Sequence, residues 1–230
     1  MNFKFINGFK IYGFLSEIDL INSINNKKVI LVAMNAEKIA NRNTKVLQIV
    51  NENMGYADGE GCVLALKQKG LNSIKIPGSQ LWLKLISNFY KTKSFYLIGS
   101  KDYVISNTVE KLKKDFQGIN ILGFRNGYLN DFDISKLIDD LKTKKPDIIF
   151  VAQGSPKQEI FMNQLFRNYP AIYMGLGGSF DVYSGNIKNV PNLLYTLKLE
   201  WLYRIIKNPK RIKRLPKIIN FFFLLVFKKL

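Results

Sequence analysis

Three short segments of the chain combine carboxylates, amides and glycines at spacings that suit group-transfer chemistry. Asp58 stands in Tyr-Ala-Asp-Gly-Glu-Gly, Gln158 in Gly-Ser-Pro-Lys-Gln-Glu, and Gly177 in Gly-Leu-Gly-Gly-Ser-Phe-Asp. A carboxylate can remove a proton from an attacking hydroxyl. Glycine-rich turns that lead into helices present backbone N–H groups to anions. Together these residues favour a site that handles an anionic substrate with a carboxylate as base.

The residue types that the chain lacks narrow this chemistry. It has no histidine, and Cys62 is its single cysteine. Ser-His-Asp and Cys-His catalysis, imidazole metal sites, intramolecular disulfides and cysteine zinc sites are therefore excluded. A general base must be Asp, Glu, Lys or Tyr, and Asp58 is the best candidate. Its structural alternative is an aspartate that caps a helix, and Glu60 suits the role less because it would point along that helix.

The segment Gly154–Glu159 has the pattern of a strand end that leads into a helix. Pro156 suits the first helical position, and Lys157 beside a helix N-terminus would favour phosphate. Gln158 can hydrogen-bond to a sugar or a diphosphate oxygen. Both this segment and the pair Gly177-Gly178 can also be explained as ordinary turns.

Asp131-Phe132-Asp133 has the Asp-x-Asp spacing with which many sugar-nucleotide enzymes hold a divalent cation. Here the motif follows no apolar strand, and Asp133 is placed to cap a helix. We therefore expect no metal and no cofactor at this motif or elsewhere in the chain.

The basic residues are concentrated at the C-terminal end. The chain of 230 residues carries 35 basic and 17 acidic residues, a net charge of +18. From Asn186 onward there are eleven basic residues and one acid (Glu200), so +10 of that charge falls in 45 residues. Such a concentration predicts a polyanionic partner, which could be nucleic acid, anionic lipid or a diphosphate. The alternative is that all proteins of the source are rich in lysine, and this would more readily explain the charge of the first 185 residues than that of the C-terminal end.

Strand and helix patterns alternate along the first 190 residues, which predicts an α/β fold. The expected strands are Val29–Met34, Ser94–Ile98, Ile119–Phe124, Asp147–Ala152 and Ala171–Gly175, and helical patterns cover Ala36–Asn53, Gly59–Lys69, Ser79–Lys91, Asp102–Phe116, Ile134–Lys142 and Pro156–Arg167. This order predicts a Rossmann-like, mostly parallel sheet with helices on both faces. Ligands of such sheets bind at the carboxyl ends of the strands.

Residues 191–230 differ in composition from the rest of the chain and are predicted to form a helical, basic appendage. The stretch Ile218–Phe227 is strongly apolar and is followed by Lys228 and Lys229. Ten residues are too few to span a bilayer, but an apolar stretch flanked by lysines is typical of an interfacial anchor. A helix that packs back on the domain is the alternative. No secretory signal is seen at the N-terminus, so we expect a cytoplasmic location, peripheral on the membrane.

Six motifs in fixed order resemble the WecG/TagA/CpsF glycosyltransferase family, over roughly residues 30–215. They are Asn35-Ala36-Glu37, Ala57-Asp58-Gly59, Pro77-Gly78-Ser79, Gly154 to Glu159, Gly177 to Asp181 with Ser184-Gly185, and Leu199 to Arg204 with Pro209 and Arg211. The resemblance implies an inverting, metal-independent enzyme. It would move a sugar of the N-acetylmannosamine, N-acetylmannosaminuronic acid or hexose type from a UDP donor to a polyprenyl-diphosphate-linked saccharide in cell-envelope polysaccharide synthesis.

The resemblance also implies roles for individual residues. Asp58 would be the general base, Asp181 a contact for uridine, and Gln158 a contact for the donor. The remaining substrate-binding candidates are Asn35, Lys75, Lys157, Gly177, Gly178, Ser179, Arg204, Arg211 and Arg214. The chain departs from the family pattern at Ala33, where a threonine is common, at Lys75 in place of arginine, and at Gln80 in place of aspartate. Lys75 keeps the charge but loses the planar fork of a guanidinium.

Two other classes of protein remain as alternatives. A basic nucleic-acid-binding module would explain the charge, but the tail interleaves its basic residues with an apolar run, so we expect no nucleic-acid partner. An NAD-binding Rossmann protein is disfavoured because Met34 is followed by Asn-Ala-Glu and not by Gly-x-Gly. The partners expected are the donor, the lipid-linked acceptor and an anionic membrane surface, and the sequence leaves open whether the chain forms a homo-oligomer.

Overall fold

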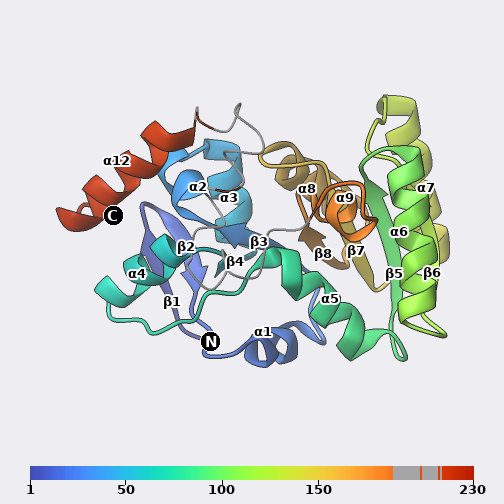
Figure 1. The fold of residues 1–230 in the computed structure, drawn as a ribbon, viewed down its shortest axis with the longest axis horizontal. Coiled ribbons are helices and arrows are strands. Elements are labelled where there is room, and N and C mark those ends of the chain that lie inside the picture. Colours follow the sequence, from blue (N-terminus) through green and yellow to red (C-terminus); the bar gives the residue numbers. More distant parts are fainter. Residues whose placement is uncertain (189–202, 204–211, 213) are drawn as a thin grey trace.

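The computed structural model describes residues 1–188, 203, 212 and 214–230. In these residues an eight-stranded sheet lies at the centre, and helices alternate with strands along most of the chain. Figure 1 shows α3 and α8 on one side of the sheet and α1 and α5 on the other. The predicted α/β class with a mostly parallel sheet is confirmed.

The sheet contains one antiparallel hairpin, and its other described strand pairings are parallel. The strands are β1 (Phe3–Ile6), β2 (Phe9–Tyr12), β3 (Val29–Met34), β4 (Met54–Ala57), β5 (Ser94–Gly99), β6 (Asn120–Arg125), β7 (Ile148–Ala152) and β8 (Ile172–Gly175). In space they follow the order β1-β2-β4-β3-β8-β7-β5-β6. Strands β5 and β7 are buried at every residue, as apolar runs inside a parallel sheet should be.

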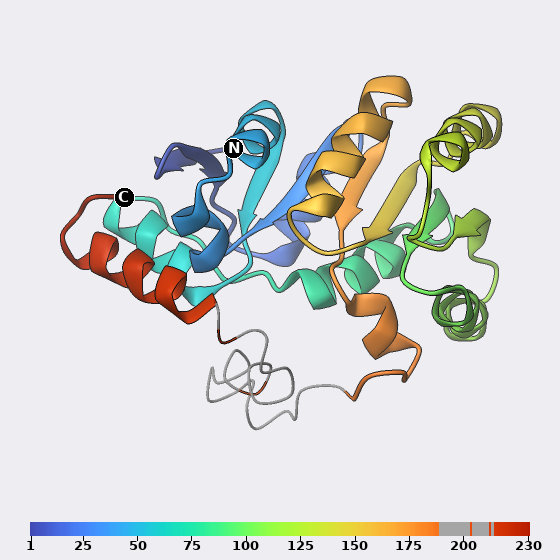
Figure 2. The same ribbon diagram turned by 90° about the horizontal axis from the view of Figure 1, so that it is seen from above.

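Strands β3 and β8 are parallel neighbours in the middle of the sheet, between β4 and β7. The carboxyl ends of these four parallel strands therefore lie at one edge of the sheet. Ligands of open parallel sheets bind outside the carboxyl ends of the strands. Figure 2 shows β4, β7 and β8 ending on the same side of the sheet, which is also the side of α9. A ligand site is therefore expected there.

Two clusters of buried apolar side chains cover the two faces of the sheet. One receives side chains from α1 (Glu17–Ile24), α5 (Gly78–Phe89), α6 (Asp102–Asp115) and α9 (Ser179–Tyr183). The other receives them from α2 (Ala36–Asn41), α3 (Thr44–Glu52), α4 (Glu60–Gln68), α7 (Asp131–Lys144), α8 (Lys157–Asn168) and α12 (Leu215–Val226). Burial on both faces fixes the sheet, and with it the loops at the strand ends.

The structure adds detail at the N-terminal end and within the helical patterns of Ala36–Asn53. The hairpin of β1 and β2 turns at Asn7 and Gly8, which both have positive φ. The helical patterns from Ala36 to Asn53 form two helices, α2 and α3. Arg42 adopts a left-handed conformation that ends α2, and Asn43 then caps α3.

Two predicted helix starts are also shifted. Asn130 and not Asp133 is the N-cap of α7, and the Asp133 carboxylate accepts the backbone N–H of Asn130 to complete a capping box. Pro156 occupies the cap position of α8, one residue before the helix begins at Lys157. Neither shift moves a candidate residue away from its strand end.

The helix α12 packs against α2 on the same side as α4 (Figure 1). Its inner face buries Phe221 and Leu225, and the aromatic ring of Phe221 lies so close to Gly61 that a Cβ there would approach it to 2.9 Å. The outer face leaves Ile219, Phe223 and Val226 exposed. No helix in the described parts of the chain is long and apolar enough to cross a membrane. The boundary of the predicted appendage at residue 191 falls outside the described residues.

Candidate functional site

Four loops meet at the carboxyl edge of the sheet, because β4, β3, β8 and β7 are neighbours in that order. They carry Asp58 after β4, Asn35 after β3, Gly177 after β8 and Gln158 after β7. The backbone N–H of Asp58 donates to the Met34 carbonyl (2.9 Å), and a Cβ on Gly59 would lie 3.5 Å from that of Asn35. The structure therefore brings these predicted site residues to one edge.

The Asp58 carboxylate does not cap the helix that follows it. Gly59 holds the cap position of α4, whereas Oδ1 of Asp58 accepts the backbone N–H of Gly78 at 2.6 Å. Gly78 is the first residue of α5, so the carboxylate faces the positive end of a twelve-residue helix. A carboxylate held by a backbone donor on one oxygen keeps a fixed orientation, as a general base requires.

Tyr56 lies on β4, two residues before Asp58, and its hydroxyl and Asp58 Oδ1 both lie beside Gly78, where a Cβ would approach them to 2.9 Å and 3.4 Å. Its hydroxyl is buried and has no hydrogen-bond partner among the described residues. Burial raises the pKa of Tyr56 well above its ordinary value, and the charges of Asp58 and Glu159 raise it further. The phenol therefore stays protonated beneath the candidate base.

Gln158 links the loops that follow β7 and β8. Its Oε1 accepts the backbone N–H groups of Gly154 (3.2 Å) and Gly177 (2.9 Å). The side chain is 5% exposed, and Gly175 leaves the room it needs, since a Cβ there would lie 2.5 Å from Nε2. Gln158 thus lies at the carboxyl edge of the sheet, and its contact with the donor stays a prediction.

A buried ion pair that the sequence analysis did not single out lies beside Gln158. Lys38 in α2 donates to Glu159 in α8 at 2.7 Å, and the Glu159 side chain is 1% exposed. Burial alone would raise the pKa of Glu159, but the adjacent ammonium of Lys38 holds it below its ordinary value. The pair ties the helix after β3 to the helix after β7.

The turn after β8 is internally bonded. Ser179 is buried and its hydroxyl donates to the Leu176 carbonyl at 2.7 Å, whereas Gly178 is exposed. The Asp181 carboxylate accepts hydrogen bonds from Ser100 Oγ at 3.0 Å and from Asn186 Nδ2 at 3.1 Å. Asp181 is thus anchored to the loop after β5, and its predicted contact with uridine stays a prediction.

The cationic candidates are distributed around this edge. Lys157 is exposed at the start of α8, and Lys75 is half-buried in the loop before α5. Arg214 pairs with Glu37 at 3.2 Å, which places it at the first turn of α2, two residues from Asn35. Arg204 and Arg211 lie outside the residues that the structure describes, so their predicted roles are untested.

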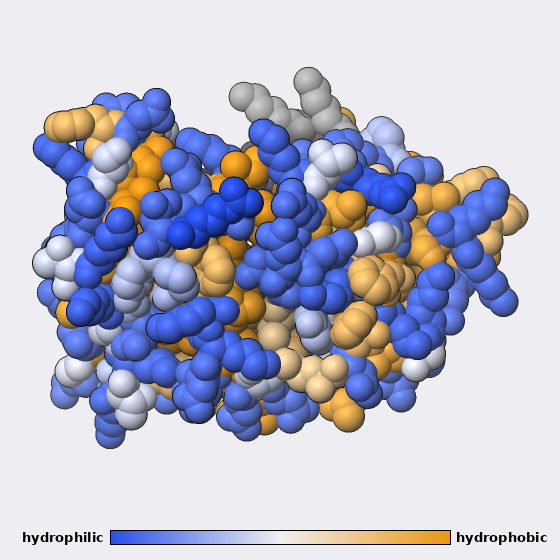
Figure 3. All heavy atoms as spheres, turned by 180° about the vertical axis from the view of Figure 1, so that it is seen from behind, coloured by the Kyte–Doolittle hydropathy of each residue, from blue (hydrophilic) through white to orange (hydrophobic). Residues whose placement is uncertain are grey.

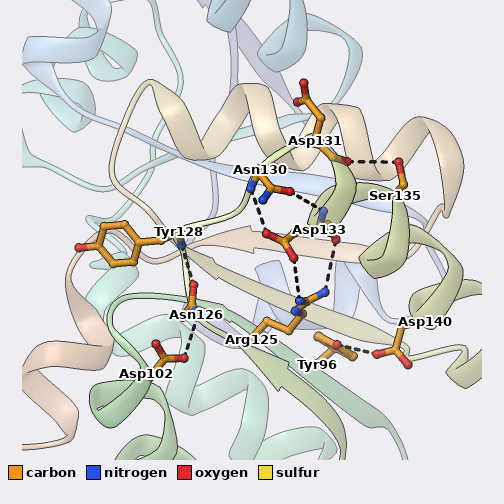
Figure 4. Close-up of polar contacts among 10 residues, drawn as sticks. All are labelled: Tyr96, Asp102, Arg125, Asn126, Tyr128, Asn130, Asp131, Asp133, Ser135 and Asp140. Carbon is orange, nitrogen blue, oxygen red and sulfur yellow. Dashed lines mark hydrogen bonds and ion pairs between the residues drawn. The ribbon is translucent and has the colours of Figure 1, made fainter.

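The Asp-x-Asp motif forms the first turn of α7 and is used structurally (Figure 4). Asp133 accepts the backbone N–H of the N-cap residue Asn130 and pairs with Arg125 at 3.3 Å. The Asp131 carboxylate points away from Asp133 in this view. Among the described residues, no group of three or more acidic or cysteine side chains is placed to hold a metal ion.

The role of Asn35 could be predicted from its local sequence. Asn35 Oδ1 accepts the Lys38 N–H and so caps α2, a role that its pattern before a helix could have indicated. Two surface hollows lie away from this edge, one of about 490 Å³ beside β6 and α7 and one of about 650 Å³ near Lys10 and Arg167. Glu159 and Tyr56 stand inside the quoted motifs, but the sequence gives no sign that both side chains are buried, because only the fold buries them.

The chain matches the family described as Glycosyl transferase WecG/TagA/CpsF over residues 6–230, which is nearly its whole length.

Proposed function

The chain belongs to the WecG/TagA/CpsF family, whose glycosyltransferases act in cell-envelope polysaccharide synthesis, and on that premise we propose its reaction. It transfers a sugar from a UDP-sugar to a polyprenyl-diphosphate-linked saccharide, with inversion at the anomeric carbon. The observation that carries this proposal is the position of Asp58, which is fixed by the N-terminus of α5 at the edge where four strand-end loops meet.

Asp58 serves as the general base. The acceptor hydroxyl attacks the anomeric carbon, a new carbon–oxygen bond forms on the face opposite the diphosphate, and the bond to UDP breaks with its electron pair. Asp58 takes the proton of the attacking hydroxyl during this step. The chain lacks histidine, so a carboxylate in this place is the natural base.

Backbone N–H groups and cations stabilise the departing diphosphate. The starts of α8 and α9 present N–H groups near Gly154 and Gly177, and Lys157 adds a cation at the same edge. Such fixed donors stabilise developing charge in place of a metal ion. In this proposal Asp181 contacts the uridine, and Arg204, Arg211 and Arg214 reach a diphosphate from the C-terminal segment.

The apolar outer face of α12 meets the membrane that holds the lipid-linked acceptor. Figure 3 shows apolar residues gathered at the end of the molecule where α12 lies, and Ile219, Phe222, Phe223, Val226 and Phe227 are all exposed. Lys217, Lys228 and Lys229 add charge near this face. An amphipathic helix with flanking cations binds the surface of an anionic bilayer without spanning it. We therefore place the protein at the cytoplasmic face of the membrane.

A donor screen tests the proposal. Purified protein is incubated with single UDP-sugars and a synthetic short-chain polyprenyl-diphosphate saccharide, with and without EDTA. We expect one UDP-sugar to give a lengthened lipid product, with unchanged yield in EDTA. A strict need for Mg²⁺ or Mn²⁺ would contradict the metal-independent step and would turn attention back to Asp131. Transfer from no UDP-sugar would contradict the proposed donor class.

A further inference from the structure

The buried ion pair of Lys38 and Glu159 does more than join two helices. Lys38 Nζ donates both to Glu159 Oε1 (2.7 Å) and to the Ala33 carbonyl near the end of β3 (2.8 Å). Gln158 Nε2 donates to the same Oε1 at 3.3 Å. Lys38 from α2 and Gln158 from α8 therefore meet at one carboxylate oxygen, and Lys38 also ties this oxygen to the end of β3.

This carboxylate holds the donor end of the Gln158 amide. A glutamine amide has a donor end and an acceptor end that can exchange places by a half-turn. Here the donor end faces Glu159, and the acceptor end faces two backbone N–H groups, those of Gly154 and Gly177. The reversed amide would set an oxygen against the carboxylate and N–H groups against N–H groups. The carboxylate of Glu159 on one side and the two backbone N–H groups on the other thus select the same orientation.

We propose that Glu159, held by Lys38, is a positioning residue: it fixes the Gln158 amide and thereby the two loops that face the donor diphosphate. This inference rests on the proposed role of the loops at Gly154 and Gly177. Glu159 touches no substrate, since its side chain is 1% exposed. Its second oxygen, Oε2, is buried without a hydrogen-bond partner among the described residues. Burying a carboxylate oxygen without a partner costs free energy, so apolar residues of similar volume would stabilise the fold at least as well.

Two single variants and their double variant distinguish an effect on stability from an effect on the position of Gln158. Glu159→Met or Lys38→Met leaves one partner of a buried pair uncompensated, which is strongly destabilising. Methionine is used at position 159 because a glutamine there would still offer an amide oxygen to Gln158. We expect either variant to lower Tm by roughly 5–15 °C. The double variant carries no buried charge, so most of that loss should return. It still lacks the carboxylate that orients Gln158, so its loops should remain mispositioned.

The first measurement is amide hydrogen exchange by NMR and needs no substrate. In the wild-type protein the Gly154 and Gly177 N–H groups should be protected by Gln158 Oε1. In the double variant both should exchange at least about tenfold faster, while the amides of β7 and β8 keep their protection. Asp140→Asn is the matched control, because it neutralises the partly exposed pair with Lys144 far from these loops. Unchanged protection of both glycines in the double variant would overturn the proposal.

The second measurement is transfer, once a donor is known. The double variant should recover Tm but keep kcat lowered by about tenfold or more, with a smaller change in the KM for the acceptor. Recovery of kcat together with Tm would mean that the pair only stabilises the fold and would overturn the positioning role. If the wild-type protein transfers no sugar from any UDP donor, the reaction proposed above fails, but the exchange measurement still decides the role of Glu159 in orienting Gln158.

Discussion

The packing of Phe221 predicts how α12 is held on the domain. Phe221 is fully buried against Gly61 and Ala36, and Leu225 is nearly so. Burial of such side chains contributes about 1.5–3 kcal/mol each, so the pair gives about 3–6 kcal/mol before the entropic cost of docking. Phe→Ala changes in a core cost about 3–5 kcal/mol. Phe221→Ala should therefore remove most of the docking free energy.

Hydrogen exchange with mass spectrometry measures this effect. A loss of about 3 kcal/mol shifts the docking equilibrium roughly 100-fold, so peptides that cover residues 36–41 and 215–226 should exchange much faster in Phe221→Ala. The control is Phe223→Ala, on the same helix, where the side chain is 55% exposed and little change is expected. Equal exchange in the wild type and in Phe221→Ala would refute the docking described here.

Three further predictions concern separate features. Lys38 holds the pKa of Glu159 below its ordinary value, so the ion pair adds stability above the unfolded pKa, near 4.3, and this stability is lost as the pH falls through the lower folded pKa. In thermal melts from pH 6 to 3, the Tm of Glu159→Gln should therefore fall less steeply than that of the wild type, and parallel curves would contradict this. Burial and then Asp58 raise the pKa of Cys62 well above its ordinary value, so a thiol reagent at pH 8 should label the native protein at least about a hundredfold more slowly than the unfolded chain. Phe223→Ser should weaken binding to anionic vesicles severalfold in a sedimentation assay, whereas Phe132→Ser, an equally exposed aromatic residue on α7, should not; equal binding by both would remove α12 from the membrane contact.

The parallel core of the fold follows from the sequence, because its signals are local. Continuous apolar runs such as Val29–Met34 indicate strands buried on both faces, and glycines or small polar residues mark their ends. The hairpin at Asn7-Gly8 has a turn signal of the same local kind, yet the exposed strand β1 lacks the apolar run that marks a buried strand. The break between α2 and α3 at Arg42 rests on a left-handed residue that the helical period does not reveal.

The candidate site is only partly visible in the sequence. Asp58 and Gln158 stand in recognisable segments, so their positions at strand ends could be predicted. The sequence does not show that Asp58 binds the N-terminus of α5 instead of capping α4, since that depends on how the loop before Gly78 crosses the edge. The pair of Lys38 and Glu159 spans 121 positions and arises only when β3 and β7 flank β8 in the sheet.

The most direct test of the whole account is the transfer rate of Asp58→Asn. An asparagine oxygen can still accept the Gly78 N–H, so the fold and Tm should be kept, while the loss of a general base should lower kcat by roughly 10²–10⁴-fold. Glu60→Gln, two residues further along in α4, is the matched control and should retain near-normal turnover. A folded Asp58→Asn protein that transfers sugar at the wild-type rate would contradict the account, and a loss confined to Glu60→Gln would move the base to that residue.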